Sequence, residues 1–356
     1  MNNLPDILPD RSNWLGDDPA CTIVVSSRIR LARNLGNRAF PGWAGEEECV
    51  RTCRELEASL SATVAMRKCH ILEMTALSPL DRDILRERHL MSNEMAAKGR
   101  GSALALRQDG VIGVMINEED HLRMQALTPG FNLDMLWAAI SSLDDELGAA
   151  VSYAYSSSLG YLTACPTNLG TGLRASVMLH LPGLVIVKEI EPVIKGLNKI
   201  GLTARGLLGE GTDAMGNMFQ VSNQVTLGEA ETDIIRRLQT VIGELVGHEQ
   251  NARRRLIEQR PVLLRDFVGR AYGTIMHAGL LTSREALDLL SAMSLGRELD
   301  MVENLEHSVI NRLIILAQPA HLQKHLRRGL DIEERDAARA RLLREEFQRN
   351  NVRVVS

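Results

Sequence analysis

The sequence predicts an α+β protein, a sheet with helices added irregularly, followed by an all-α C-terminal domain. Strand-like and helical segments mix in the first part of the chain without the regular alternation of βαβ units. One turn, Gln108-Asp109-Gly110, lies between two apolar runs, as in a β-hairpin. From Glu229 onward the pattern is helical throughout. These observations favour two domains of different class within the 356 residues.

The apolar pattern also predicts the individual elements of the first part of the chain. In chain order these are a strand at 21–27, a helix at 46–60, hairpin strands at 102–107 and 111–117, a helix at 131–147, a strand at 173–181, a helix at 191–200 and a strand at 218–226.

The later part of the chain is predicted to consist of helices. Apolar residues recur at helical spacing between Ile234 and Val246. Thr282-Ser283-Arg284-Glu285 and the segment from Asp331 to Glu334 have the form of capping boxes. The segment NARRRLIEQRP ends the long helix at a proline. We therefore expect an α+β domain at 1–255 and a helical domain at 256–356.

The composition narrows the class of protein. Because 41 basic residues face 45 acidic ones, with a net charge of −4, a general nucleic-acid or anionic-membrane binder is disfavoured. The N-terminus has no apolar signal region, and no apolar run approaches membrane-spanning length. The five cysteines are odd in number, which fits a reducing cytoplasm. Cys49 and Cys53 are better explained as half-buried helix positions than as a zinc half-site, so no metal is assigned to protein side chains.

Two polar clusters follow apolar strands. In SSRIRLARN, Arg28 and Arg30 alternate as strand residues do, so both guanidinium groups can point to the same side. Taken alone, this segment is better explained as a solvated edge strand. In NEEDHLR, which follows the strand VIGVMI, a carboxylate could lie beside a cationic acceptor while Arg123 faces a phosphate. The alternative there is a polar loop.

Two glycine-rich clusters come later in the chain. CPTNLGTGLRAS runs from a turn into a strand and places Arg174 at its mouth. RGLLGEG again brackets an arginine and a carboxylate with glycines. Such turns present backbone N–H groups to anions, although a glycine-rich loop alone is a weak signal.

Together the four segments resemble the ATP:guanido phosphotransferase family, whose signatures they match in the same order between about residues 22 and 250. The resemblance implies a guanido-kinase catalytic domain with a mainly antiparallel sheet flanked by helices. The motifs of P-loop kinases and of eukaryotic-type protein kinases are absent from the sequence.

Guanidinium chemistry explains why this family needs these residue types. A guanidinium is a poor nucleophile because its pKa exceeds about 12 and its lone pairs are delocalised. Two carboxylates can hold it bidentately, and one of them can take a proton as it attacks. The resemblance assigns this pair to Glu119 and Glu210; which of them is the base stays open, because coupled carboxylates titrate as a pair. It assigns to Cys165 a reactive thiolate that favours the charge of the guanidinium.

The resemblance also implies a site for ATP and Mg²⁺, because phosphoryl transfer mainly requires alignment and neutralisation of charge. Arginines would surround the phosphates, and a histidine in ERHL would lie near the nucleotide. The expected nucleotide-binding residues are Ser27, Arg28, Arg30, His89, Arg123, Arg174, Ala175, Ser176, Val177, Met178, Arg205, Gly206 and Gly209.

Departures from the small-molecule kinases of the family indicate the acceptor. Those kinases carry about a hundred residues ahead of SSRIR, where about 25 stand here. Met178 stands where they have a histidine, which is similar to the bacterial protein-arginine kinase branch. We therefore expect protein arginine side chains as the acceptor. A small-guanidine kinase is the nearest alternative.

The segment RDAARA is similar to the phosphoarginine-binding element of that branch. On a helix, Arg335 and Arg339 share a face and can grip one phosphoryl group, while Asp336 could pair with its guanidinium and Ala340 completes the element. Without the kinase signatures, an exposed salt-bridged helix would explain the segment better. A phosphoarginine-binding adaptor with little activity is therefore a further alternative.

The resemblance implies partners as well. These are protein substrates with exposed arginines, a zinc-binding activator protein, a Clp-type ATP-dependent protease for which phosphoarginine marks substrates during stress and quality control, and a second copy of the chain in an allosteric homodimer.

Overall fold

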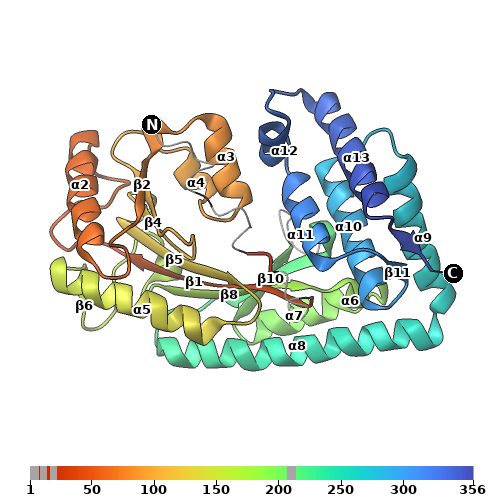
Figure 1. The fold of residues 1–356 in the computed structure, drawn as a ribbon. Coiled ribbons are helices and arrows are strands. Elements are labelled where there is room, and N and C mark those ends of the chain that lie inside the picture. Colours follow the sequence, from red (N-terminus) through yellow and green to blue (C-terminus); the bar gives the residue numbers. More distant parts are fainter. Residues whose placement is uncertain (1–7, 9–13, 17–21, 207–213, 356) are drawn as a thin grey trace. The chain divides into compact units, whose positions relative to one another are not determined.

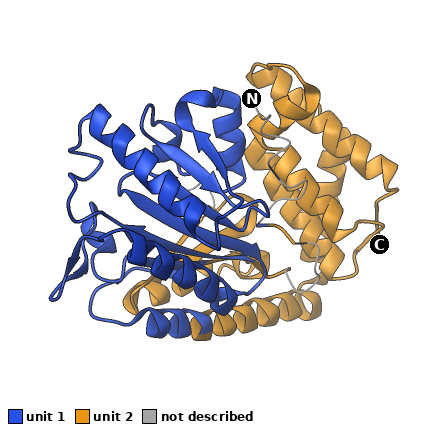
Figure 2. Ribbon diagram, turned by 60° about the vertical axis from the view of Figure 1, so that its left-hand side comes forward, with its two compact units in different colours: residues 1–14, 26–176, 222–239 blue, residues 15–25, 177–221, 240–356 orange. Residues whose placement is uncertain are grey.

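The computed structural model describes residues 8, 14–16, 22–206 and 214–355. Contacts divide the chain into two compact units, one made of 1–14, 26–176 and 222–239 and the other of 15–25, 177–221 and 240–356 (Figure 2).

Strands of an eight-stranded sheet supply most of the β-structure, in the order β2-β3-β4-β5-β1-β8-β10-β9 (Figure 1). Their bounds are β1 (Val24–Arg33), β2 (His70–Glu73), β3 (Ala103–Leu106), β4 (Ile112–Ile116), β5 (Leu122–Pro129), β8 (Leu173–His180), β9 (Leu202–Gly206) and β10 (Met218–Asn223). Two short antiparallel pairs are β6 (Tyr155–Ser156) with β7 (Gly160–Tyr161) and β11 (Val302–Glu303) with β12 (Arg353–Val354).

The described residues form α-helices and single 3-10 turns. The α-helices are α2 (Glu46–Ala62), α3 (Pro79–Glu87), α4 (Asn93–Ala96), α5 (Leu133–Ala150), α6 (Pro182–Ile186), α7 (Ile190–Lys199), α8 (Glu231–Gln259), α9 (Pro261–His277), α10 (Ser283–Glu298), α11 (His307–Leu316), α12 (Pro319–Leu326) and α13 (Ile332–Arg349). Single 3-10 turns are η2 (Met74–Ala76), η3 (Pro166–Asn168) and η4 (Met215–Asn217).

In the first unit, β2, β3, β4, β5 and β1 pair antiparallel in turn, which confirms the predicted mainly antiparallel sheet. The predicted hairpin is β3 and β4, with Leu106 opposite Gly113. The predicted strand at 21–27 instead runs on to Arg33, with Arg28 and Arg30 partly exposed between buried residues and the last three residues all buried. Helix α5 packs against β5 (Figure 1).

Strand β1 decides where the arginines of SSRIR point. Ile29 and Leu31 are 0 % exposed. The residues that alternate with them, Arg28 and Arg30, are only partly buried. Alternation along a strand therefore places both guanidinium groups on the face opposite the two apolar side chains, as predicted.

The second unit contains the helical C-terminal region. Helix α10 lies at its centre and packs against α9, α11 and α13. As predicted, the long helix α8 ends near the proline: its last residue is Gln259, and Pro261 begins α9. Thr282 caps α10, and Asp331 forms a capping box with Glu334 at the start of α13.

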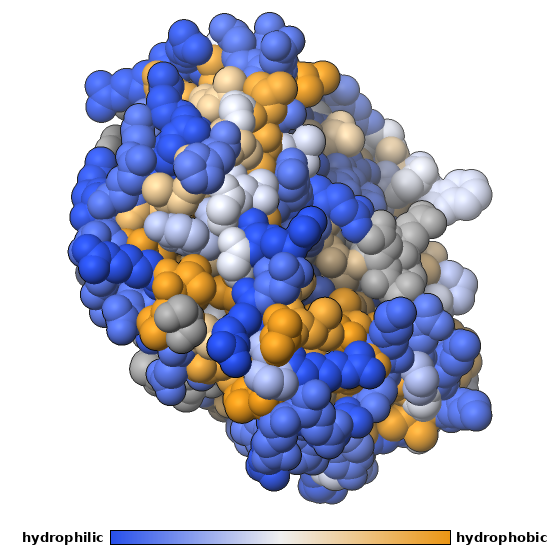
Figure 3. All heavy atoms as spheres, turned by 90° about the vertical axis from the view of Figure 1, so that its right-hand side faces the viewer, coloured by the Kyte–Doolittle hydropathy of each residue, from blue (hydrophilic) through white to orange (hydrophobic). Residues whose placement is uncertain are grey.

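The face in Figure 3 carries mostly hydrophilic side chains with apolar ones between them. None of the helices in the described ranges is long and apolar enough to cross a membrane.

The described cysteines are all free thiols. Cys49 and Cys53 both lie on α2, as expected; Cys49 is half-buried, as predicted, whereas Cys53 is buried. Within the part of the chain that the structure describes, no group of three or more His, Cys, Asp or Glu side chains is placed to hold a metal ion.

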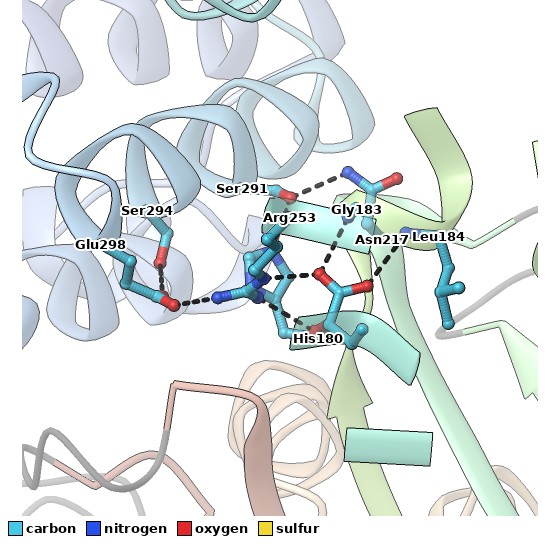
Figure 4. A network of polar contacts seen from close by, with 9 residues as sticks. His180, Gly183, Leu184, Asn217, Arg253, Ser291, Ser294 and Glu298 are labelled. Carbon is cyan, nitrogen blue, oxygen red and sulfur yellow. Dashed lines mark hydrogen bonds and ion pairs between the residues drawn. The ribbon is translucent and has the colours of Figure 1, made fainter. Parts of the chain in front are cut away.

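A buried polar network holds the second unit together (Figure 4). Arg253 on α8 donates to Glu249 at 2.6 Å and also pairs with Glu298 on α10. Glu249 accepts hydrogen bonds from the backbone N–H groups of Gly183 and Leu184, each at 2.9 Å. Because every carboxylate in this network is paired, the two charges of the buried Arg253–Glu249 pair are compensated.

His180 belongs to the same network and is expected to make the protein sensitive to acid. Its Nε2 lies 2.7 Å from Ser291 Oγ, while burial and then the charge of Arg253 lower its pKa to about 3. The unfolded chain takes up a proton near pH 6.5, so the stability from the uncharged imidazole is present above that pH and is lost towards pH 3.

Between pH 6.5 and 5, wild type should therefore lose about 2 kcal/mol more free energy of unfolding than a His180→Asn variant. Urea unfolding at both pH values measures this. Equal losses in the two proteins would show that His180 is not the group responsible.

Candidate active site

Four arginines gather on the sheet of the first unit. Burial, and after it the charges of Arg123 and Arg174, lower the pKa of Arg28 to about 10. Burial and then Arg28, Arg123 and Arg174 also hold the pKa of Arg30 well below its usual value. Arginines that lower one another's pKa lie close together, so this cluster is suited to binding a polyanion.

The register of β1 and β5 explains why two of these arginines face the same way. Ala32 lies opposite Arg123, and Arg30 lies opposite Gln125. Residues opposite each other on antiparallel strands share a face, and diagonal neighbours on that face lie within reach of long side chains. Arg30 and Arg123 are such a diagonal pair.

Arg174 is held through its backbone neighbours. Asn223, which is 1 % exposed, accepts from the N–H of Ala175 at 2.8 Å and donates to the carbonyl of Leu173 at 3.0 Å. These two hydrogen bonds flank Arg174 on both sides and fix the strand from which it projects.

The glycine-rich turn before Arg174 packs against the buried side chain of Arg33. Arg33 donates to Asp144 through Nε and Nη2 and to the carbonyl of Thr171 at 2.9 Å. A Cβ on Gly172, whose φ is +64°, would come within 2.7 Å of Arg33 Nη1. Glycine is therefore required here by close approach as well as by its conformation. The turn serves packing in this structure, and its role towards anions stays a prediction.

Glu118 is a residue whose role the sequence analysis missed. It is 0 % exposed, and both of its oxygens accept from Arg123 Nη1 at 2.7 Å. Ser92, which caps α4, also donates to it. The signal in the sequence was weak, because three adjacent acids give no indication of which one turns inward. Because both of its oxygens accept hydrogen bonds from Arg123, the buried Glu118 carboxylate orients that side chain.

A Glu118→Gln substitution is expected to lower the free energy of unfolding by about 1–3 kcal/mol, because Arg123 loses its charged partner. It should also weaken nucleotide binding, since Arg123 is no longer held. Thermal unfolding and titration with Mg·ADP measure the two effects. Glu94→Gln, which alters an exposed carboxylate on α4, is the matched control. Wild-type values for both properties in Glu118→Gln would contradict the orienting role.

Glu119 differs from its neighbours because it stays exposed. Partial desolvation and then the carboxylates of Asp120 and Glu118 raise its pKa. A raised pKa brings a carboxylate closer to the range in which it can take and return a proton.

Asp120 connects the acidic segment to the loop of Cys165. It is 2 % exposed and accepts from Asn34 Nδ2 at 2.5 Å and from the N–H of Ala164 at 2.7 Å. Glu119 precedes Asp120, and Cys165 follows Ala164. The hydrogen bond between Ala164 and Asp120 therefore connects the direct neighbours of Glu119 and Cys165. The Cys165 thiol itself lies 3.0 Å from Thr167 Oγ1.

His89 lies next to the arginine cluster. Its backbone has a positive φ of 57°, and its carbonyl accepts from Gln125 Nε2 at 2.9 Å. Desolvation and then the charge of Arg28 lower its pKa to about 3, so the imidazole is neutral at physiological pH.

The other expected nucleotide-binding residues have varied positions. Ser27 is buried and donates to the carbonyl of Gly130 at 2.8 Å. Ala175 and Ser176 lie on β8 in the first unit, Val177 and Met178 on β8 in the second, and Arg205 and Gly206 on β9 in the second. Gly209 and Glu210 lie outside the described residues.

Comparison with known proteins decides the family. Residues 52–252 match the catalytic domain of ATP:guanido phosphotransferases, and residues 261–354 match the C-terminal domain of the protein-arginine kinase McsB. The protein-arginine kinase of Brevibacillus brevis is 42 % identical over 341 residues, which is 95 % of each chain. That of Desulforamulus reducens is 45 % identical over 338 residues, 94 % of this chain and 95 % of its own. The chain belongs to the protein-arginine kinase branch of the ATP:guanido phosphotransferases.

Solved structures of more distant guanido phosphotransferases share the fold. Lombricine kinase is 24 % identical with a TM-score of 0.57 over 68 % of this chain and 72 % of its own. The duplicated taurocyamine kinase of Schistosoma mansoni is 22 % identical with a TM-score of 0.61, over 76 % of this chain. This chain spans 39 % of that duplicated one.

The RDAARA segment of this guanido phosphotransferase lies on α13 in the second unit. Arg339 is 1 % exposed and donates to the carbonyls of Ala317 and Leu281 and to Asp336, each at 2.6 Å. Arg335 is only partly buried. Arg339 therefore has a structural role that helix spacing did not predict, and binding of phosphoarginine by this pair stays a prediction.

Proposed function

We propose that this protein transfers the γ-phosphoryl group of ATP to arginine side chains of proteins. The observation that carries the proposal is the cluster of Arg28, Arg30, Arg123 and Arg174 on one sheet, together with the exposed carboxylate of Glu119 just before β5. The four arginines would bind a polyphosphate, and the carboxylate of Glu119 would bind a guanidinium beside it.

The arginine cluster fits ATP in a second respect. Arg30 Nε is buried and has no hydrogen-bond partner among the described residues. A buried donor without a partner is costly, and a phosphate oxygen would satisfy it. Mg²⁺ would enter with the nucleotide, because it prefers phosphate and water oxygens and supplies neutralisation of the transferring group.

The residues of the chain would perform three tasks in the reaction. The arginines align the phosphates and offset charge as it develops on the transferred group. Glu119 holds the acceptor guanidinium and takes its proton, together with the carboxylate predicted at Glu210. Cys165 is proposed to favour the charged form of the acceptor as it binds.

Support for a protein acceptor comes from the relatives. Proteins named protein-arginine kinase resemble this chain along 94–95 % of its length. The proposal includes binding of phosphoarginine by Arg335 and Arg339, with Asp336 and Ala340, within the region that matches their C-terminal domain. We extend the proposal to a cytoplasmic, allosteric homodimer that works with a zinc-binding activator and marks proteins for a Clp-type protease during stress.

The test is incubation of the purified protein with Mg·ATP and either an unfolded arginine-rich protein or free L-arginine. Products are identified by mass spectrometry under non-acidic conditions, because acid destroys the N–P bond. Phosphoarginine on the protein, and none on the free amino acid, is the expected result. Phosphorylation of free arginine alone would replace the proposal with a small-guanidine kinase. Loss of the product in Glu119→Gln excludes a contaminating kinase.

A further inference from the structure

An N-terminal tryptophan contacts the histidine of the proposed nucleotide site. Trp14 is 3 % exposed, and its ring centroid lies 4.6 Å from that of His89 with the planes at 84°. This edge-to-face geometry is the favourable one for aromatic rings. Since Gln125 holds the backbone of His89 from the sheet, Trp14 and Gln125 fix the residue from two directions.

The strand register indicates which end of the proposed nucleotide site would hold the phosphates and which end the nucleoside. Glu119 precedes β5, whose Arg123 lies opposite Ala32, whereas Leu127 lies opposite Arg28. Four residues along a strand cover about 14 Å. The phosphoryl group must be transferred at the end where Glu119 holds the acceptor. The nucleoside then lies towards the other end, where Arg28 and His89 are neighbours.

The indole of Trp14 has a feature that packing alone does not require. Its Nε1 is buried without a hydrogen-bond partner in the described part of the chain. Phenylalanine could make the same ring contact without a buried, unpaired donor. The indole N–H of Trp14 therefore costs free energy of folding that ring packing alone does not require. Such a donor next to a nucleotide site points to a bound ligand.

We propose that Trp14 is a positioning residue of the nucleotide site, where its indole fixes the imidazole of His89 against the nucleoside of ATP. The inference rests on the proposed function for the identity of the ligand. It adds a residue from the N-terminal segment to a site otherwise built from the sheet and the segment before α4.

The first experiment compares Trp14→Ala with wild type in the full-length protein. The Kd for Mg·ADP and the KM for Mg·ATP should both rise about 3- to 10-fold, while kcat stays within about twofold. Trp43→Ala is the matched control, because that side chain is 90 % exposed, and it should leave all three values unchanged. An unchanged Kd, or a fall in kcat alone, in Trp14→Ala would overturn the proposal.

A double-mutant cycle separates positioning from general support of the fold. If Trp14 acts through His89, Trp14→Ala should have no further effect on the Kd for Mg·ADP in a His89→Ala background. The same loss in both backgrounds would overturn the proposal. Because binding of ADP is measured directly, this result stands apart from arginine phosphorylation: a protein without kinase activity could still show the coupling, and an active kinase could lack it.

A spectroscopic measurement covers the case in which Trp14→Ala does not fold. Trp43→Phe combined with Trp137→Phe leaves Trp14 as the single tryptophan of the chain. Saturating Mg·ADP should change its emission, and the change should disappear when His89→Ala is added. Emission that stays constant while calorimetry detects bound ADP would overturn the proposal.

Discussion

Arg30→Met is expected to weaken binding of Mg·ADP about 100-fold while raising the stability of the nucleotide-free protein. The guanidinium of Arg30 is held among Arg28, Arg123 and Arg174, which together with burial lower its pKa well below the usual value. Two charge-assisted hydrogen bonds to phosphate, at about 1.5 kcal/mol each, account for the loss of affinity. Removal of one like charge relieves the repulsion among the others, which should raise the melting midpoint by roughly 2–4 °C.

Calorimetric titration and thermal unfolding without nucleotide measure the two effects of Arg30→Met. Arg341→Met is the matched control, because the Arg341 side chain is 59 % exposed on the last long helix. It should change neither property, since exposed ion pairs contribute little. A lower melting midpoint in Arg30→Met would mean that Arg30 supports the fold, and the cluster would then need no anion to explain it.

Short-range patterns predicted the parts of the site that local geometry determines. The alternation of Arg28 and Arg30 follows from the period of a strand, and the capping box at Asp331 follows from the spacing of two side chains. Strand β5 was missed because LRMQALTP is buried on both faces for most of its length and therefore does not alternate. A strand that is buried on both faces gives no such signal.

Contacts between distant segments could not be predicted from spacing. Glu118 turns inward because Ser92 and Arg123 meet it there, and neither partner is indicated by the three adjacent acids. Arg339 has the expected helical relation to Arg335, yet its burial depends on carbonyls of two other segments. Trp14 approaches His89 only in the folded chain. In each case tertiary packing, and not local propensity, decides which residues meet.

Glu119→Gln is expected to lower kcat for protein phosphorylation by about 10²- to 10⁴-fold, the range for loss of a general base. Binding of Mg·ADP should stay within about twofold, because the amide keeps the size of the side chain and Glu119 is exposed and is not a member of the Glu118–Arg123 ion pair. Steady-state kinetics with an unfolded arginine-rich protein and calorimetry with Mg·ADP measure these quantities. A variant with full activity would remove Glu119 from the reaction.

The pH dependence of the same reaction provides an independent test. Desolvation and the neighbouring carboxylates raise the pKa of Glu119, and only its deprotonated form can accept a proton from the guanidinium. The value of kcat/KM in wild type should therefore fall as the pH is lowered through this raised pKa, at a higher pH than for an unperturbed glutamate. In Glu118→Gln one of the charges that raises this pKa is absent, so the acid limb of the profile should move to lower pH. An acid limb at the same pH in both proteins would show that another group, such as the carboxylate predicted at Glu210, governs the profile.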